Sequence, residues 1–90
     1  MNTKFEASFE KDVKKVRERT MLQTIKESIL DVKQSKTIRD IANLKKLKGY
    51  ETCYRIRCGR YRIGIEIIDD TVIFTRSLHR KDIYRYFPKG

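Results

Sequence analysis

The chain has 90 residues, a formal net charge of +10 and 38% charged residues. This length suits one domain with one modest core, so residues 1–90 are interpreted as a single domain without linkers or repeats. The positive charge favours an anionic partner: nucleic acid, an anionic membrane surface or an acidic protein. No apolar run approaches the roughly 20 residues of a membrane-spanning helix, and no secretion signal precedes the charged N-terminal segment. We therefore expect a cytoplasmic protein that does not bind membranes.

The N-terminal part of the sequence predicts a short strand followed by a helix. The strand is expected over residues 3–7, and Ser8 is the predicted N-cap of the helix. Glu10 and Asp12 fit the first helical turn, where the helix dipole favours negative charge. The apolar stripe of this helix consists of Phe9, Val13 and Val16.

A second helix is the clearest signal in the sequence. Thr20 is its predicted cap, and the pattern fades near Ser35. Apolar residues recur at spacings of three and four, at Leu22, Ile25, Ile29 and Val32. Two consecutive helices joined by a short polar connection predict an antiparallel αα-hairpin. The following segment, residues 37–50, is basic and less regular.

Three consecutive strands are predicted at residues 53–58, 61–68 and 71–78, with a turn at Asp69-Asp70 between the last two. The middle strand alternates, so that its isoleucines face one side of the sheet and its polar residues the other. We therefore expect the helices to cover one apolar face and the second, basic face to stay open.

The predicted fold class is α+β. An N-terminal strand and the αα-hairpin pack on one face of a small, mainly antiparallel twisted sheet, in the order β-α-α-β-β-β. Ile83 and Phe87 are four residues apart and indicate a short C-terminal helix, which Pro88 ends. Cys53 and Cys58 fall on opposite faces of one strand and are expected to be inert, reduced thiols. With a single histidine and no C-x-x-C pair, we expect neither a metal site nor a cofactor.

The first two of the three strands bring arginines together. If residues 59–60 form a two-residue turn, Arg57 lies directly opposite Arg62. Arg55 then faces Gly64, which has no side chain to fill the space. Because like charges directly across a sheet are destabilising, this register predicts an anion between the guanidiniums, either a polyanion or a pentavalent phosphate.

The element order and four short motifs resemble the RelE/ParE toxin superfamily. The motifs are Lys46-Leu47-Lys48-Gly49, Tyr54-Arg55-Ile56-Arg57, Gly59-Arg60-Tyr61-Arg62-Ile63 and His79-Arg80-Lys81-Asp82-Ile83-Tyr84. The resemblance covers nearly the whole chain and implies the toxin half of a toxin–antitoxin pair. In the RelE-like branch, the implied activity is metal-independent cleavage of messenger RNA in the ribosomal A site. The expected partners are mRNA, the ribosome and a cognate acidic antitoxin.

The resemblance also implies roles for catalytic residues. Arg62 resembles the family arginine that stabilises the transition state, whereas Arg55 and Arg57 stand where relatives often carry lysines. An arginine stays protonated at neutral pH and is a poor general base, so His79 is the expected general acid or base. Arg80 is expected to be a second phosphate clamp.

Aromatic and basic residues around these positions are candidates for RNA binding. Tyr84 and Tyr86 both fit tyrosine positions found in the family, and either ring is suited to stack on an unpaired base; we favour Tyr84 for the catalytic group. The expected phosphate-docking residues are Lys45, Lys46, Lys48 and Arg60.

Two other functions remain open at this point. The ParE-like branch of the same superfamily poisons DNA gyrase and cleaves no RNA. A non-catalytic module would use the same arginines only to hold RNA or the ribosome. The basic groove, the His79-Arg80 pair and the tyrosines near the C-terminus favour the endoribonuclease.

Overall fold

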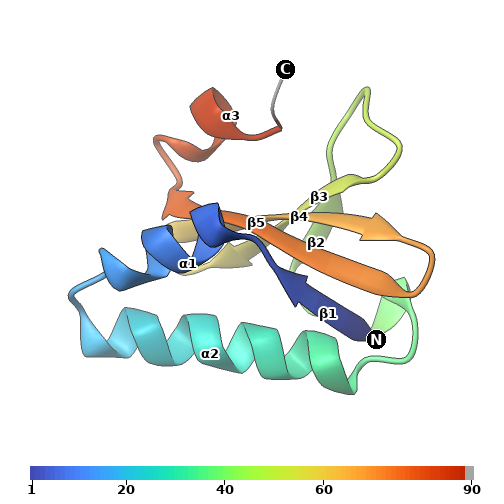
Figure 1. Cartoon of the computed structure of the whole chain (residues 1–90), viewed down its shortest axis with the longest axis horizontal. Coiled ribbons are helices and arrows are strands. Elements are labelled where there is room, and N and C mark those ends of the chain that lie inside the picture. The colour runs from blue at the N-terminus through green and yellow to red at the C-terminus, as the bar shows by residue number, and fades with distance from the viewer. Residues whose placement is uncertain (89–90) are drawn as a thin grey trace.

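The computed structural model describes residues 1–88. Its main elements are shown in Figure 1. The strands coincide with alternating apolar and polar residues bounded by tight turns, and α2 coincides with apolar residues at spacings of three and four. In chain order the elements are β1 (Asn2–Phe5), α1 (Ala7–Lys14), α2 (Arg19–Gln34), the 3₁₀ turn η1 (Ile38–Asp40), β2 (Leu44–Lys46), β3 (Cys53–Cys58), β4 (Tyr61–Ile68), β5 (Thr71–His79) and α3 (Ile83–Tyr86).

The strands form one five-stranded sheet in the order β1-β5-β4-β3-β2. β1 runs parallel to β5, and every other neighbouring pair is antiparallel. The predicted α+β class, the three consecutive strands and the short C-terminal helix are confirmed. The prediction missed β2, whose three residues are too few to show an alternating pattern. It forms on the open edge of β3, where Leu44 pairs with Ile56.

The register between β3 and β4 is the predicted one. Gly59, at the turn, has a φ of +59°, a left-handed conformation that glycine adopts without strain. Arg57 consequently pairs with Arg62, and Arg55 pairs with Gly64. The turn at Asp69-Asp70 is confirmed as well, with Asp69 at a φ of +54°.

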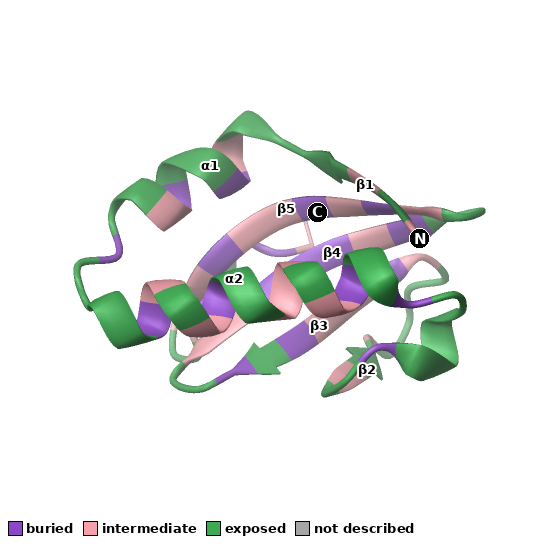
Figure 2. Ribbon diagram, turned by 90° about the horizontal axis from the view of Figure 1, so that it is seen from below, coloured by how far each residue is buried: buried purple, intermediate pink, exposed green. Residues whose placement is uncertain are grey.

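The main core lies between the sheet and the helices α1 and α2. Each helix brings a stripe of apolar residues to it, and β4 and β5 supply the sheet side (Figure 2). Its fully buried members include Ile25, Val32, Ile63, Ile65, Val72 and Phe74. α1 packs mainly on β5 and α2 mainly on β3, so each helix covers its own part of one sheet face.

The bounds of the first strand and of the two helices differ from the prediction by one or two residues. β1 ends at Phe5 and α1 begins at Ala7, so Glu6 rather than Ser8 occupies the N-cap position. The Ser8 hydroxyl instead donates a hydrogen bond to the Thr75 carbonyl, 2.6 Å away, and fixes α1 to β5. Asp12 lies past the first turn of α1 and is buried, which the dipole argument did not anticipate.

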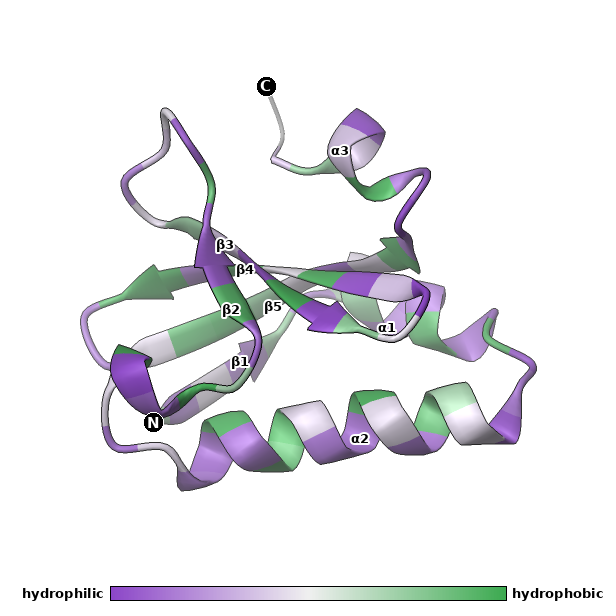
Figure 3. Cartoon of the chain, turned by 180° about the vertical axis from the view of Figure 1, so that it is seen from behind, coloured by the Kyte–Doolittle hydropathy of each residue, from purple (hydrophilic) through white to green (hydrophobic). Residues whose placement is uncertain are grey.

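A second, smaller core occupies the opposite face of the sheet. Cys53, Ile83 and Phe87 are buried together there, with Leu47 and Leu78 packed against them. α3 and the loop between β2 and β3 stand on this face, away from α2 (Figures 1 and 3). The expectation that this whole face stays open was therefore wrong, because the C-terminal segment covers part of it. No helix among residues 1–88 combines the length and apolarity needed to cross a bilayer.

Candidate active site

Four guanidiniums gather on the face of the sheet that carries the second core. We call Arg55, Arg57, Arg62 and Arg80 the arginine cluster. β3 and β4 place Arg57 directly opposite Arg62, and the backbone N–H of Arg80 donates to the Arg60 carbonyl at 2.8 Å, which fixes the turn after β5 against the hairpin. Burial, and then the charges of Arg55, Arg57 and Arg80, lower the pKa of Arg62, while Tyr84 acts in the opposite direction. The cluster therefore carries electrostatic strain at Arg62.

Backbone carbonyls hold two of these side chains in place. Arg62 Nη1 donates to the carbonyls of Gly59 and Tyr61, each at 2.9 Å. Arg55 Nη1 donates at 2.9 Å to the Asn43 carbonyl, which precedes β2. No ion pair within 4.0 Å joins the cluster to a carboxylate among the described residues. The guanidiniums of Arg55 and Arg62 are thus preorganised by neutral groups and keep their charge for a ligand.

Arg60 does not join this cluster, although it lies in the same hairpin. Its guanidinium forms an ion pair with Glu18, at the N-terminal end of α2. The lysines also divide. Lys45 pairs with Arg55 across β2 and β3 and extends the basic face, whereas Lys46 pairs with Tyr54, which packs against the main core. Lys48 lies beyond β2 and is exposed.

His79, the expected general acid or base, lies on the helix-covered side of the sheet. It pairs with Tyr61, and the two rings are 6.0 Å apart between centroids in an edge arrangement. Its Nδ1 accepts a hydrogen bond from the Lys81 backbone N–H at 3.2 Å. Tyr61 packs against the main core, whereas Arg62 pairs with Leu78 of the second core. Arg62 and His79 therefore belong to opposite faces.

A β-bulge in β5 explains why His79 lies on this face. Ile65 pairs with Phe74, but Gly64 pairs with Arg76, so Thr75 is an extra residue in β5. One extra residue reverses the face of every later side chain in the strand. Without it, His79 would share a face with Arg62. The available signal was Arg76, which unbroken alternation would point into the apolar core.

The two candidate tyrosines occupy different places. Tyr84 is 59% exposed, and its side chain acts to raise the pKa of Arg62. The ring of Tyr86 instead lies over Arg76, with 5.3 Å between the guanidinium carbon and the ring centroid. This separation supports the preference for Tyr84 as the aromatic residue at the arginine cluster.

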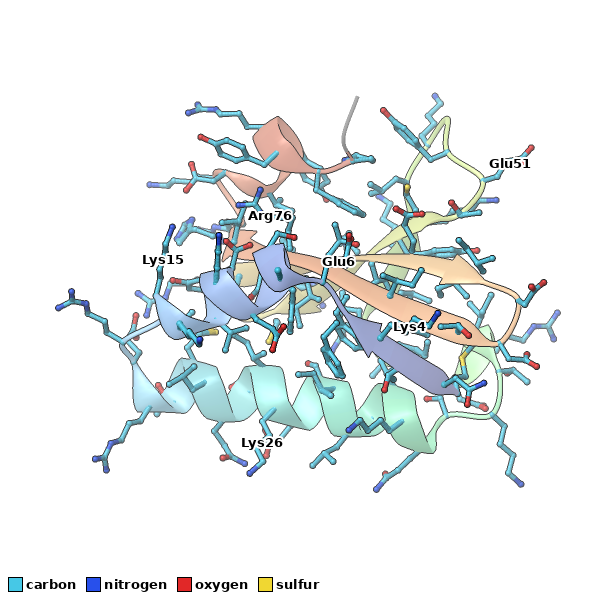
Figure 4. All side chains as sticks on the ribbon, viewed as in Figure 1. Lys4, Glu6, Lys15, Lys26, Glu51 and Arg76 are labelled. Carbon is cyan, nitrogen blue, oxygen red and sulfur yellow. The ribbon has the colours of Figure 1, made fainter. Side chains whose placement is uncertain are left out.

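An ion pair that was not predicted from the sequence connects α1 and β5. Asp12 Oδ2 accepts from Arg76 Nε at 2.7 Å and from the Ser77 N–H at 3.0 Å, and Oδ1 accepts from Arg76 Nη2 at 3.1 Å. The hydrogen bonding with Asp12, together with the charge of that carboxylate, raises the pKa of Arg76. Arg76 lies between α1 and α3 (Figure 4). The signal was Asp12 itself, at a core-facing position three residues after Phe9 and four before Val16.

Within residues 1–88, no three histidine, cysteine, aspartate or glutamate side chains form a possible metal-binding group. The chemistry of the cluster is that of fixed positive charge. Forked guanidinium donors match pairs of phosphate oxygens, and charge held in place before binding stabilises negative charge that develops on a reacting phosphate.

Comparisons with known proteins agree with this fold. Residues 3–84 match the family model described as the ParE toxin of the type II toxin-antitoxin system parDE. The chain is 47% identical to toxin RelE3 of Methanocaldococcus jannaschii, over 98% of this chain and 100% of that protein. Among solved structures, it is similar to a chain of the RelB–RelE antitoxin–toxin complex from Methanococcus jannaschii, with a TM-score of 0.79, 46% identity and coverage of 94% and 99% of the two chains.

A bacterial structure gives a more distant match. The intact E. coli RelBE toxin–antitoxin complex contains a chain with a TM-score of 0.67 and 27% identity, covering 87% of this chain and 94% of that one. The protein therefore belongs to the RelE/ParE family of toxins of type II toxin–antitoxin systems. The full-length similarity to RelE3 makes it more particularly a RelE-type toxin of a toxin–antitoxin pair.

Proposed function

We propose that the protein is a metal-independent endoribonuclease that cleaves messenger RNA in the ribosomal A site and thereby inhibits translation. The observation that carries this proposal is the arginine cluster, in which Arg57 and Arg62 are directly opposed and neither is paired with a carboxylate. Like charges held together without a partner cost stability, and a bound phosphate offsets that cost. The cluster is therefore suited to bind RNA at a phosphate.

The proposed reaction is an internal transesterification. The ribose 2′-hydroxyl attacks the adjacent phosphorus, forming a P–O2′ bond while the P–O5′ bond breaks. The products are a 2′,3′-cyclic phosphate and a 5′-hydroxyl. Negative charge builds on the non-bridging oxygens, where Arg62 and Arg57 provide N–H donors and Arg80 and Arg55 provide further positive charge.

Proton transfer in this reaction needs groups other than arginine. The attacking hydroxyl must lose a proton to a base, and the leaving O5′ must gain one. Tyr84 carries a hydroxyl, and its effect on the pKa of Arg62 supports a place for it in the site. We propose Tyr84 as the residue that orients the reacting nucleotide and shares in proton transfer. His79, on the other face, becomes the weaker candidate for this role.

An acidic antitoxin is the proposed partner. A chain with a net charge of +10 and an exposed phosphate-binding surface would bind cellular RNA without selection unless that surface were masked. The similar chains from M. jannaschii and E. coli were solved as complexes of RelE with RelB. A short acidic, helix-rich protein encoded beside this one would supply the complementary charge.

The test is 5′-end mapping of cellular RNA after induction of the wild-type protein and of Arg62→Ala. The wild type is expected to produce cuts in phase with codons, whereas Arg62→Ala is expected to produce at least a hundredfold fewer. Arg39→Ala is the matched control, because it removes the same charge from the exposed η1 turn, outside the arginine cluster. Equal cutting by the wild type and Arg62→Ala would contradict the proposal.

A second function is favoured by one specific observation, namely that the matching family model is that of the ParE toxin. In that case the protein would poison DNA gyrase. Induction would then leave messages intact, while DNA breaks accumulate and gyrase supercoiling falls. Salt-dependent binding to RNA without either effect would instead indicate a non-catalytic RNA-binding or ribosome-binding module.

A further inference from the structure

The aromatic ring of Phe87 lies directly on the backbone of Gly64. A Cβ atom built on Gly64 would be 2.6, 2.6 and 2.9 Å from three atoms of that ring. These distances are too short for any side chain, and Phe87 is only 2% exposed, so the ring has little room to move away. Gly64 is therefore required by close approach and not by its backbone angles.

This contact determines where α3 lies. A helix of four residues has no stability of its own, so its position depends on what it packs against. Two buried residues hold it: Ile83, with no exposed surface, and Phe87 at its C-terminal end. Both belong to the second core, where Leu47 of the β2–β3 loop also packs. Tyr84 and Tyr86 lie between these two anchors in the chain.

The Phe87 contact is also adjacent to the arginine cluster. Gly64 pairs with Arg55 on β3 and with Arg76 on β5. It is two residues from Arg62 on the same face of β4, a distance of about 7 Å along a strand. The C-terminal segment, which carries Tyr84, thus rests on the sheet within one side chain of the guanidiniums.

We propose that Gly64 is a positioning residue, whose missing side chain forms the seat for Phe87 and so holds Tyr84 beside Arg62 during RNA cleavage. This inference rests on the proposed function. It adds a requirement that the arginines alone do not impose: the sheet must be bare at Gly64 for the C-terminal segment to complete the site.

The experiment compares cleavage of a ribosome-bound message by the wild type, Gly64→Ala and Ile65→Val. Gly64→Ala is expected to slow cleavage at least tenfold, because the added methyl group displaces Phe87. Ile65→Val is the matched control, since Ile65 is the next residue of β4 but faces the main core. It removes one methylene group from the other side of the sheet and is expected to leave the cleavage rate unchanged.

Two further variants separate positioning from simple loss of structure. Gly64→Ala combined with Phe87→Leu is expected to regain at least threefold in rate, because leucine leaves room for the new methyl group. Tyr84→Ala is expected to cost at least tenfold in the wild type but less than twofold in Gly64→Ala, where Tyr84 is already displaced. An equal cost in both backgrounds, or wild-type cleavage by Gly64→Ala, would overturn the proposal.

Two outcomes would prevent this comparison of cleavage rates, and each has its own test: a wild type that does not cleave, and a Gly64→Ala variant that does not fold. If the wild type does not cleave, the proposed function fails. Positioning is then tested by NMR, where Arg62→Ala should shift the Tyr84 ring resonances in the wild type but not in Gly64→Ala; equal shifts in both would overturn it. If Gly64→Ala does not fold, Phe87→Ala removes the same contact while leaving the sheet unchanged. Phe87→Ala is likewise expected to slow cleavage at least tenfold, and cleavage at the wild-type rate would contradict the proposal.

Discussion

The two faces of the sheet differ in role: one holds the main core, and the other carries the candidate active site. The face under α1 and α2 is apolar and closed, with Ile63, Ile65 and Phe74 fully buried. The other face carries directly opposed arginines and only a small core around Phe87. Alternate residues of β4 serve the two faces in turn. We therefore expect substitutions at neighbouring positions of β4 to have different effects. A substitution on the helix-covered face should lower the free energy of unfolding, and one on the other face should lower the rate of RNA cleavage.

The largest stability effect is expected on the helix-covered face. Phe74→Ala removes a fully buried ring that lies 4.9 Å from Phe5 and 5.3 Å from Phe9, measured between ring centroids. We expect a loss of about 3–5 kcal/mol in the free energy of unfolding, measured by urea denaturation. Molecules that remain folded should still bind RNA through the arginine cluster. A loss below about 1 kcal/mol would contradict this description of the main core.

The ion pair at the edge of β5 should have an intermediate effect. Asp12→Ala leaves Arg76 and the Ser77 N–H without their acceptor. The expected cost is about 2 kcal/mol, below the roughly 3–5 kcal/mol of a fully buried pair, because the Arg76 side chain is 23% exposed. Glu10→Ala, an exposed acid on the same helix, is the control and should change stability by less than about 0.5 kcal/mol. Equal effects would show that the Asp12–Arg76 pair contributes nothing.

On the opposite face, a substitution is expected to stabilise the fold while it weakens function. Arg57→Gln removes a charge directly opposite Arg62 and should raise the free energy of unfolding by about 0.5–1 kcal/mol. RNA affinity should fall in the same variant, and the stability gain should shrink in roughly 1 M salt, where charges are screened within about 3 Å. A variant that is less stable than the wild type at low salt would refute the repulsion.

The smallest expected effect concerns the pH dependence of stability. Burial raises the pKa of the Cys58 thiol above its ordinary value of 9.0, although Ser28 donates a hydrogen bond to the sulfur. The folded state therefore binds this proton more tightly than the unfolded chain, so the contribution is complete below pH 9.0 and is lost as pH rises through the raised value. Between about pH 8 and 10, Cys58→Ala should lose less stability than the wild type in urea denaturation. An identical fall in the free energy of unfolding of the wild type and of Cys58→Ala would contradict this contribution of the thiol.

The sequence was most informative where local chemistry decides the structure. The β3–β4 turn follows from Gly59, and with it the pairing of Arg57 and Arg62, because a two-residue turn fixes the register. The α2 helix follows from the spacing of its apolar residues. These features depend on residues close together in the sequence, and they were predicted correctly.

What could not be predicted depends on contacts between distant segments. The bulge at Thr75 turns His79 to the helix-covered face, and its one signal in the sequence is Arg76, which unbroken alternation would place in the apolar core. The three residues of β2 form a strand by pairing with the edge of β3, which is a contact between separate segments. The fit of Phe87 on Gly64 joins residues 23 positions apart, as their numbers show. The sequence shows that Gly64 has no side chain, but not which residue packs on it.

The most direct test of the central claim separates RNA binding from the chemical step in Arg62→Ala. Single-turnover cleavage of a ribosome-bound message is measured beside the affinity for the same complex. If fixed guanidinium charge stabilises the phosphorane, the cleavage rate should fall by about 10²–10³ while the dissociation constant changes less than about tenfold. Cleavage at the wild-type rate, or a loss explained wholly by weaker binding, would contradict the account.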